Sequence, residues 1–387
     1  MKKTLVALAA LAATSAFAQS SVTLYGVIDQ GVYAKKSVGP AGGVAGAANA
    51  TYKIQGIGDD ESSSHGEGTL NGSRLGFKGT EDLGGGLTAS FQIEMGLFPS
   101  EKSNSAAAST SPMRQRNTFV ALAGNFGEVK LGRIYTHVWA TQASHDQGGN
   151  NGLYGWNAGL AGSGNRQANV LQYTAPTVNG VTASVFKGYG QTITDSAAAA
   201  GAAGADKLDE VTSFGLAYAN GPLTANFAYE TTSNHTLHDM LTSDTKRTVL
   251  AAGLQLVGGV AADFDTPGEA PDTTVTAFGG TYDFKVAKVS YVNQKMKIDK
   301  DTGTDLTLKT SGFSVGIPVG KTTYFASSST AKNNAATEVK HAGSQLGAVY
   351  DLSKRTALYA ILGNNKLTAG ADSVKFTSSA FGVRHSF

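Results

Sequence analysis

Apolar and polar residues alternate along most of the chain, in runs of about ten positions that end at clusters of turn-forming residues. In 222-PLTANFAYE-230, Leu223, Phe227 and Tyr229 share one face, whereas Asn226 lies on the other. A period of two predicts a β-strand with one apolar face and one polar face. Three further segments repeat this alternation: 87–96, 213–219 and 312–318.

The connections between the expected strands fall into two alternating length classes. Seven are very short and predict tight hairpins, whereas eight are long, polar and rich in Gly, Ala, Ser and Asn. The short connections are 81–86, 124–127, 176–180, 219–222, 283–286, 318–321 and 351–355. The long connections are about 36–72, 98–113, 136–165, 189–210, 231–273, 298–308, 330–341 and 365–376.

Seven hairpins join fourteen strands, and one strand at each end of the chain, 22–33 and 377–387, brings the number to sixteen. An even strand number with alternating short turns and long loops is typical of a transmembrane antiparallel β-barrel. We therefore predict an all-β barrel of sixteen strands. The apolar segment 247–264 can add a hairpin within 240–275, which would give eighteen strands. A secreted β-sandwich or β-solenoid fits the alternation too, but the two segregated classes of connection favour the barrel.

The first residues have the features of a secretory signal peptide. Two lysines are followed by an apolar run and by small residues ahead of a cleavage site after Ala18. We therefore divide the chain into a signal peptide, 1–18, and a barrel domain, 19–387. Beyond the signal no apolar run is long enough for a helix to span a bilayer.

Charge and cysteine content narrow the class of protein further. Without the two signal lysines, 29 basic residues balance 29 acidic ones, so the net charge gives no reason to expect nucleic acid as a partner. Cysteine is absent, so disulfides do not hold the fold together. The 49 glycines and only 8 prolines suit many short strands joined by turns.

Four stretches of the chain resemble the general, non-specific porins of Gram-negative bacteria, above all their betaproteobacterial and neisserial-type branch. They are 22-VTLYGVIDQGV-32, 73-SRLGFKGTEDLGGGLTASFQIE-94, 116-RNTFVALAGNFGEVKLGR-133 and 378-SSAFGVRHSF-387. The resemblance implies a homotrimer in the bacterial outer membrane, in contact with its lipid and lipopolysaccharide. It also implies that the third external loop folds inward to narrow each pore. That loop is 136–165, in which Asp146 is the only acid.

The last strand of a barrel must pair with the first, because an unpaired strand edge is not tolerated in lipid. Phe381, Val383 and Phe387 share the outward parity of the last strand, which puts the terminal ring at the periplasmic interface. The resemblance adds a second role for Phe387, as part of the signal read by the outer-membrane insertion machinery.

A channel selects by its width and by the charges at its narrowest point, so the residues that select must face the lumen. Leu75 and Phe77 set the outer face of their strand. Arg74 and Lys78 have the opposite parity and are expected to face inward, and the same reasoning places Glu94 inside.

Two further arginines complete the predicted constriction. Leu171 and Tyr173 set the outer face of their strand, which places Arg166 inside. Arg116 lies in a segment that is apolar on both faces, and only the resemblance suggests that it faces inward. With Arg74 these residues would form a permanently charged row opposite the third loop.

The predicted function is passive diffusion of ions and small hydrophilic solutes through an outer-membrane channel. A weak to moderate preference for anions is expected, because four basic side chains face two acidic ones: Arg74, Lys78, Arg116 and Arg166 against Glu94 and Asp146. A surface adhesin or receptor built on the long loops is an alternative. A barrel hydrolase using His137 or His145 is disfavoured, and no G-x-S-x-G or H-E-x-x-H motif is present, so we expect no enzyme.

Signals for cofactors and metals are weak, and we predict neither. The run 316-GIPVGKT-322 has three residues between its glycines, whereas a phosphate-binding loop needs four. The aspartates of 299-DKDTGTD-305 are spaced like calcium ligands but lack the terminal glutamate of the full loop, which favours a solvated turn. His235 and His238 with Asp239 fall in a long loop with no further ligand placed beside them, and neither this set nor Asp299, Asp301 and Asp305 predicts a metal site.

Overall fold

The computed structural model describes residues 21–40, 49–58, 70–97, 113–148, 166–192, 207–208, 210–233, 272–299, 305–335 and 338–387. Almost all of these residues lie in antiparallel strands, and α2 (His137–Ser144) is a helix. The strands are β1 (Ser21–Pro40), β2 (Asn49–Gly58), β3 (Arg74–Gly84), β4 (Leu87–Leu97), β5 (Met113–Gly124), β6 (Gly127–Tyr135), β7 (Arg166–Thr174), β8 (Val181–Gly188), β9 (Gln191–Thr192), β10 (Lys207–Leu208), β11 (Glu210–Asn220), β12 (Leu223–Ser233), β13 (Thr273–Asp283), β14 (Lys288–Ile298), β15 (Leu306–Val319), β16 (Thr322–Asn333), β17 (Val339–Asp351), β18 (Thr356–Ala369) and β19 (Asp372–Ser386).

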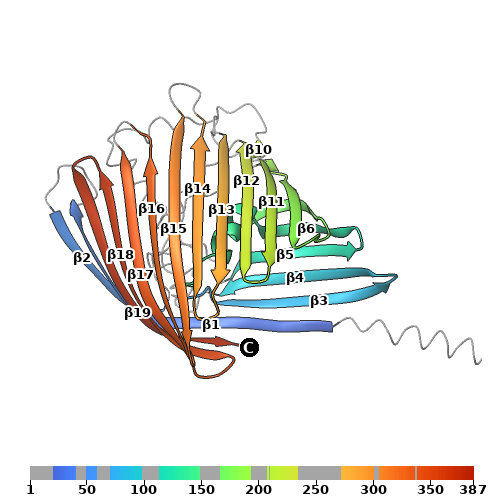
Figure 1. Ribbon diagram of the computed structural model, residues 1–387, viewed down its shortest axis with the longest axis horizontal. Coiled ribbons are helices and arrows are strands. Elements are labelled where there is room, and N and C mark those ends of the chain that lie inside the picture. The colour runs from blue at the N-terminus through green and yellow to red at the C-terminus, as the bar shows by residue number, and fades with distance from the viewer. Residues whose placement is uncertain are drawn as a thin grey trace, which may run out of the picture.

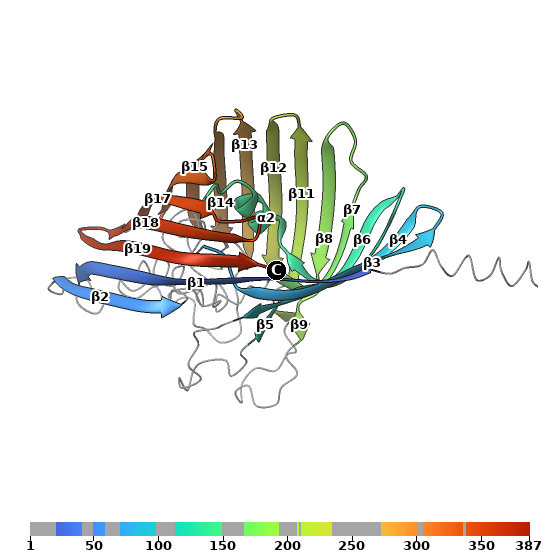
Figure 2. The same ribbon diagram turned by 90° about the horizontal axis from the view of Figure 1, so that it is seen from below.

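The sheet closes on itself through β1, which lies between the last strand and β3 (Figures 1 and 2). Val27–Val38 of β1 pairs with β19, and Ser21–Val27 pairs with β3. From β3 to β19 the strands of the main sheet pair in chain order, and β11 follows β8 because β9 and β10 form a small separate hairpin. The result is the predicted closed barrel of sixteen strands, with β2 as an additional strand.

The seven predicted tight hairpins are confirmed. In each case two antiparallel strands are joined within the predicted short connection or one residue from it, as at Gly320–Lys321 between β15 and β16. The segment 316–322 is therefore part of a strand-to-strand hairpin and does not precede a helix. The possible extra hairpin at 247–264 lies outside the described residues.

Four of the predicted long connections differ from the structure. The segment 189–210 contains the small β9–β10 hairpin, and only 334–338 of the segment 330–341 connects β16 to β17. The segment 36–72 contains β2, which pairs with Gly31–Pro40 of β1, past the residues of β1 that pair with β3. The segment 365–376 is the tight end of the β18–β19 hairpin, which turns at Gly370. Gly370 has a φ of 57°, a left-handed conformation that favours glycine. This segment looked like a polar loop because its outward side chains are polar, although Leu367 and Ala369 are buried inside.

The outer face of the barrel is apolar and the inner face is polar. Tyr229 and Ile93 are each 44% exposed on the outside, whereas their neighbours Glu230 and Glu94 are buried inside. This distribution reverses that of a water-soluble domain and suits a barrel whose outer surface meets lipid. In the described part of the chain, no helix has the length and apolar character needed to cross a membrane.

The first and last strands of the barrel meet at Phe387, as expected from the pattern of the terminal strand. The backbone N–H of Phe387 donates to the Gly26 carbonyl, and the Gly26 N–H donates to the Phe387 carbonyl, each at 3.1 Å. The Phe387 ring lies directly over Gly26, where any Cβ would overlap it. The ring is 42% exposed on the outward face.

Candidate functional site

The third external loop turns into the barrel directly after β6. Thr136 accepts a hydrogen bond from the Trp139 N–H at 3.2 Å and so caps the first turn of α2. Val138 is fully buried and packs on inward-facing wall residues that include Ala228 and Ala277. This part of the inner wall is apolar where most of the interior is polar, so it provides a seat for the helix.

His137 ties the start of α2 to the inner wall. Its Nδ1 contacts the Ser213 hydroxyl at 2.9 Å, and its Nε2 contacts the Ser184 hydroxyl at 2.7 Å. Burial lowers the pKa of His137 from 6.5 to about 4, so the imidazole is neutral at neutral pH. The second nitrogen is also 3.1 Å from the side-chain nitrogen of Gln172.

His145 ties the end of α2 to the wall in the same way. Its Nδ1 lies 2.7 Å from the Thr281 hydroxyl, and its Nε2 lies 2.8 Å from the Asn226 amide oxygen. Burial lowers the pKa of His145 as well, although its contact with Asn226 opposes the shift. Wall side chains therefore engage both ring nitrogens of both histidines that were considered for a hydrolase.

Two glutamines of the loop bind to the next strands of the inner wall, β14 and β15. Gln142 hydrogen-bonds to Gln294 of β14. The Gln147 backbone N–H donates to Ser314 at 2.9 Å, and its amide donates to Ser290 at 2.8 Å. The inward-folded third loop is thus confirmed for its described part, which crosses the inner wall from β7 to β15 (Figure 2).

Two of the predicted arginines meet on the wall beside the start of this loop. Arg116 Nε donates to Glu94 Oε1 at 2.6 Å, and its guanidinium donates to the Tyr135 hydroxyl at 3.0 Å. Arg166 hydrogen-bonds to the same hydroxyl, and its guanidinium carbon lies 4.1 Å from the Tyr135 ring centroid. Tyr135 stacks on Trp139 of α2, with ring centroids 3.9 Å apart. The two arginines are therefore placed by one tyrosine.

The other predicted charges on this wall lie around Tyr25. Its hydroxyl donates to Glu94 Oε2 at 3.0 Å and accepts from Gln92 at 2.6 Å. Lys78 Nζ lies 5.4 Å from the centroid of the Tyr25 ring. Arg74 is close enough to act electrostatically on Glu94 and Tyr25. Arg74, Lys78, Glu94, Arg116 and Arg166 thus share one side of the interior, on β3, β4, β5 and β7.

Asp146 lies elsewhere, just after α2. It accepts a hydrogen bond from the Gly148 N–H at 2.8 Å. The adjacent Gln147 reaches β14 and β15, which lie across the barrel from β3 to β7 in strand order. The structure therefore places this acid opposite the basic row and does not bring it into that cluster.

Several residues of this site were not predicted from the sequence. Val22, Leu24 and Gly26 share the outward parity of their strand, and Tyr25 has the opposite, inward parity. Alternation alone could therefore have found Tyr25. Tyr135 was not foreseeable in this way, because a register irregularity between Gly132 and Ile134 interrupts the alternation of β6.

The aspartates considered for calcium have another partner. Lys297 Nζ lies 2.6 Å from Asp299 Oδ1 and 2.9 Å from Asp305 Oδ2. Both carboxylates thus contact one ammonium group, which offsets one of their two negative charges. Asp301, His235, His238 and Asp239 lie outside the described residues.

A closed barrel with an apolar outer face, a polar interior and a loop inserted into its lumen defines an outer-membrane channel. The chain belongs to the Gram-negative porin family, whose model it matches over residues 4–370. It is 34% identical to outer membrane porin protein 32 of Delftia acidovorans over 371 residues, which cover 93% of this chain and 88% of that relative. The chain is therefore a porin of the bacterial outer membrane and not an enzyme.

Two further relatives agree with this assignment. The solved anion-selective porin from Comamonas acidovorans superposes with a TM-score of 0.68 at 26% identity, covering 95% of this chain and 100% of that one. Major outer membrane protein P.IB of Neisseria meningitidis serogroup B is 37% identical over 134 residues, which cover 35% of this chain and 34% of that protein. The predicted resemblance to the betaproteobacterial and neisserial-type branch is confirmed.

Proposed function

We propose that this porin prefers small anions, and that its selecting constriction lies between the basic row on β3, β5 and β7 and the described part of the third loop. The row consists of Arg74, Arg116 and Arg166, with Lys78 beside it. The observation that carries the proposal is the shared placement of Arg116 and Arg166 on Tyr135 next to α2. Two guanidinium groups are thereby held where the loop begins to enter the lumen.

The charge balance at this level supports an anion preference. Glu94 offsets one positive charge through its contact with Arg116. Asn117 positions Arg166 through a neutral amide at 3.0 Å and adds no charge. Arginines stay protonated across the working pH range, so the positive field does not titrate. Solutes would pass by diffusion, because conduction requires that they bind to the lining weakly enough to leave it again.

A reversal-potential measurement in a potassium chloride gradient tests the sign of the preference. The wild type is expected to favour chloride, and a cation preference would overturn the proposal. The variant Arg74→Gln/Arg166→Gln should shift the reversal potential toward the cation value. Lys321→Gln/Arg355→Gln removes the same charge at exposed turns and serves as the matched control. If both double variants gave the same selectivity as the wild type, the named arginines would be wrong.

A homotrimer is also proposed for the assembled channel. One solved OmpT of Vibrio cholerae is described as a trimer form and shares the fold, with a TM-score of 0.59 at 15% identity. Conductance in planar bilayers should then rise in groups of three equal steps, and single isolated steps would contradict the trimer.

We also propose that residues 1–18, which lie outside the described residues, are the signal peptide that directs export of the chain.

A further inference from the structure

Three acidic side chains are buried among the described residues: Asp29, Glu94 and Glu230. Asp29 accepts a hydrogen bond from the Tyr359 hydroxyl at 2.7 Å, and Glu94 pairs with Arg116. Glu230 of β12 is 1% exposed, and neither of its carboxylate oxygens accepts a hydrogen bond from a described residue. Because a buried carboxylate without a partner is unfavourable, Glu230 calls for a compensating group.

Two threonine hydroxyls lie on the same inward face as Glu230. Thr232 follows Glu230 by two positions on β12, and Thr273 of β13 is the direct partner of Thr232. Both threonines are buried, and their hydroxyls also have no hydrogen-bond partner in the described part of the chain. Directly opposite side chains on one face of a sheet are close neighbours, and a diagonal neighbour lies within reach of a long side chain. We call this set of unpartnered oxygen atoms the oxygen patch: Glu230, Thr232 and Thr273.

The oxygen patch lies beside the seat of α2. Ala228, two positions before Glu230, belongs to the same buried cluster as Val138. Ser213 of β11 is the direct partner of Glu230 and is close enough to influence its carboxyl group. The Ser213 hydroxyl, however, contacts His137 at 2.9 Å and completes no hydrogen bond with Glu230. His137 is neutral at neutral pH, so it does not supply the missing positive charge.

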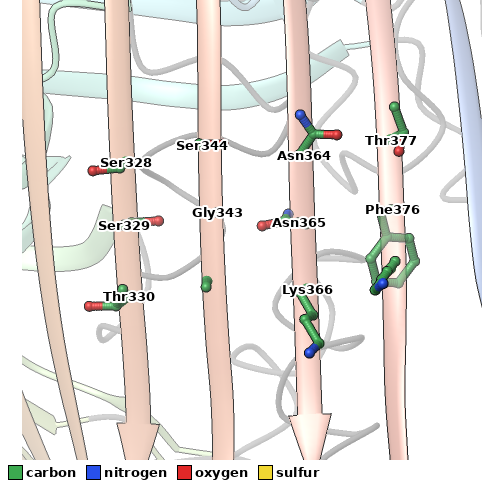
Figure 3. A pocket seen from close by; sticks show the side chains of 12 residues that line it. Ser328, Ser329, Thr330, Gly343, Ser344, Asn364, Asn365, Lys366, Phe376 and Thr377 are labelled. Carbon is green, nitrogen blue, oxygen red and sulfur yellow. The ribbon is translucent and has the colours of Figure 1, made fainter.

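Other oxygen-rich parts of the described barrel lack this combination. Serine, threonine and asparagine side chains line a hollow of about 420 Å³ on β16 to β19 (Figure 3). The charged groups of that hollow are Lys366 and Lys375, and no carboxylate lines it. Asp299 and Asp305 do carry carboxylates, but they share the ammonium group of Lys297. The oxygen patch instead joins a buried, unpartnered carboxylate to two free hydroxyls.

The chemistry of the oxygen patch favours a hard metal cation. A proton on Glu230 would supply one hydrogen-bond donor and leave the other oxygens without partners, whereas one metal cation can contact all four. Carboxylate and hydroxyl oxygens are ligands for cations such as Ca²⁺, and the patch has no thiolate or imidazole that would favour zinc or copper. Calcium takes about six to eight oxygen ligands, so backbone carbonyls or water would complete its shell. With a single carboxylate the affinity should be low, with a Kd of roughly 0.1–1 mM.

We propose that the oxygen patch binds a hard divalent cation such as Ca²⁺ between β12 and β13. The cation offsets the negative charge of Glu230 next to the contact between Ser213 and His137. Because that contact holds the start of α2, the bound cation stabilises the docked third loop. The site is separate from the basic row on β3, β5 and β7, so the proposal does not depend on the anion preference.

Calcium titration of the full-length porin in a neutral detergent tests this proposal. Chelator-treated protein is titrated with calcium chloride in a calorimeter, and the wild type should bind one more ion per chain than Glu230→Gln. Glu210→Gln removes the same charge from a partly exposed pair with Lys187 on the neighbouring strand, and it should bind like the wild type. Calcium held by residual lipid is common to all three proteins, so the difference between them reports on the patch.

Two pairs of threonines provide a second, closely matched comparison. Thr232→Val/Thr273→Val keeps the shape of the side chains but removes both hydroxyls of the patch, so calcium should bind several-fold more weakly. Thr231→Val/Thr274→Val changes the adjacent direct pair, which has the opposite parity and faces outward. This second variant should bind calcium like the wild type.

Several outcomes would overturn the proposal. One is equal calcium binding by the wild type and Glu230→Gln, and another is equal binding by the two threonine variants. Displacement of calcium by tetramethylammonium would mean that the patch holds an organic cation instead of a metal. If Glu230→Gln failed to fold, the threonine comparison and the wild type would still decide. The Tm of the wild type should rise with calcium chloride and not with sodium chloride at the same ionic strength, and an equal rise with both salts would refute a specific site.

Discussion

The contact between Glu94 and Arg116 is the most tightly enclosed charge pair on the basic side of the pore. Their side chains are 7% and 8% exposed, and Nε lies 2.6 Å from Oε1. A buried pair is weak evidence for net stability, but removing one partner leaves the other charge uncompensated. Glu94 therefore both holds Arg116 in place and moderates the positive field of the row.

Glu94→Gln should raise the anion preference and lower stability at the same time. One negative charge is lost beside three arginines, so the reversal potential should move further toward the chloride value. The uncompensated Arg116 should lower the free energy of unfolding by about 2–3 kcal/mol, measured by denaturant unfolding in detergent. Glu128→Gln breaks the half-exposed pair with Lys130 and should cost less than about 1 kcal/mol. Equal losses in the two variants would contradict this account of Glu94.

His137 should make docking of the third loop sensitive to acid. Its pKa is about 4 when docked and 6.5 when exposed, so the docked loop binds fewer protons between these values. Docking is at full strength above pH 6.5 and weakens as the pH falls toward 4. The lowered pKa of His145 acts with the same sign. Open-channel noise in bilayer recordings should rise over this window.

The variant His137→Asn should remove part of that rise, because an amide does not titrate. His385→Asn, at an exposed position near the turn end of β19, serves as the control. If both variants kept the wild-type pH profile, His137 would have no part in loop docking.

At the scale of elements, α2 anchors the described part of the third loop against the inner wall of the barrel. Val138 is completely buried against the apolar part of the inner wall. Val138→Asp would place a carboxylate in that contact, which is unfavourable without a partner. Conductance should increase, and larger sugars should enter proteoliposomes in a swelling assay. The strand pairs are untouched, so unfolding of the barrel itself should change little.

Ser144→Asp introduces the same charge at the exposed end of α2 and is the matched control. It should leave both conductance and sugar entry at the wild-type values. Equal effects of the two substitutions would mean that charge, and not loss of the apolar seat, alters the pore.

The elements themselves were predictable where the outer face lies in lipid. The hairpins at 219–222 and 318–321 join strands whose outward positions are apolar, so the alternation has high contrast. Above the bilayer both faces of a strand can be polar, and the contrast disappears. For this reason the sequence analysis did not predict that β18 continues to Ala369 and that β19 already begins at Asp372.

At the scale of the whole molecule, closure depends on the pairing of β1 with β19. Phe387 makes two backbone hydrogen bonds to Gly26 and lays its ring over that glycine. On the lumen side of the same seam, Tyr359 donates to the fully buried Asp29 at 2.7 Å. The backbone N–H of Asn71 donates to the other carboxylate oxygen at 2.7 Å. The seam is thus fixed on both faces.

Deleting Phe387 should impair assembly more than conductance. The deletion removes the end of the seam and the proposed signal for the insertion machinery, whereas the pore wall is unchanged. The amount of folded porin in the outer membrane should fall several-fold, and the molecules that do insert should conduct normally. Phe387→Tyr keeps the ring and should assemble normally. Normal insertion of the deletion variant would count against this role of Phe387.

The sequence by itself determined the barrel, its strand number and the inward parity of Arg74, Lys78 and Glu94, because alternation and turn chemistry are local. It did not determine which charges meet. Arg116 reaches Glu94 only because β4 and β5 pair with an irregular register after Ile93. Arg116 and Arg166 share Tyr135 only because β6 departs from regular pairing near Gly132. The path of the third loop was likewise decided by tertiary structure, since its seat is assembled from apolar residues on several strands that are distant in the chain.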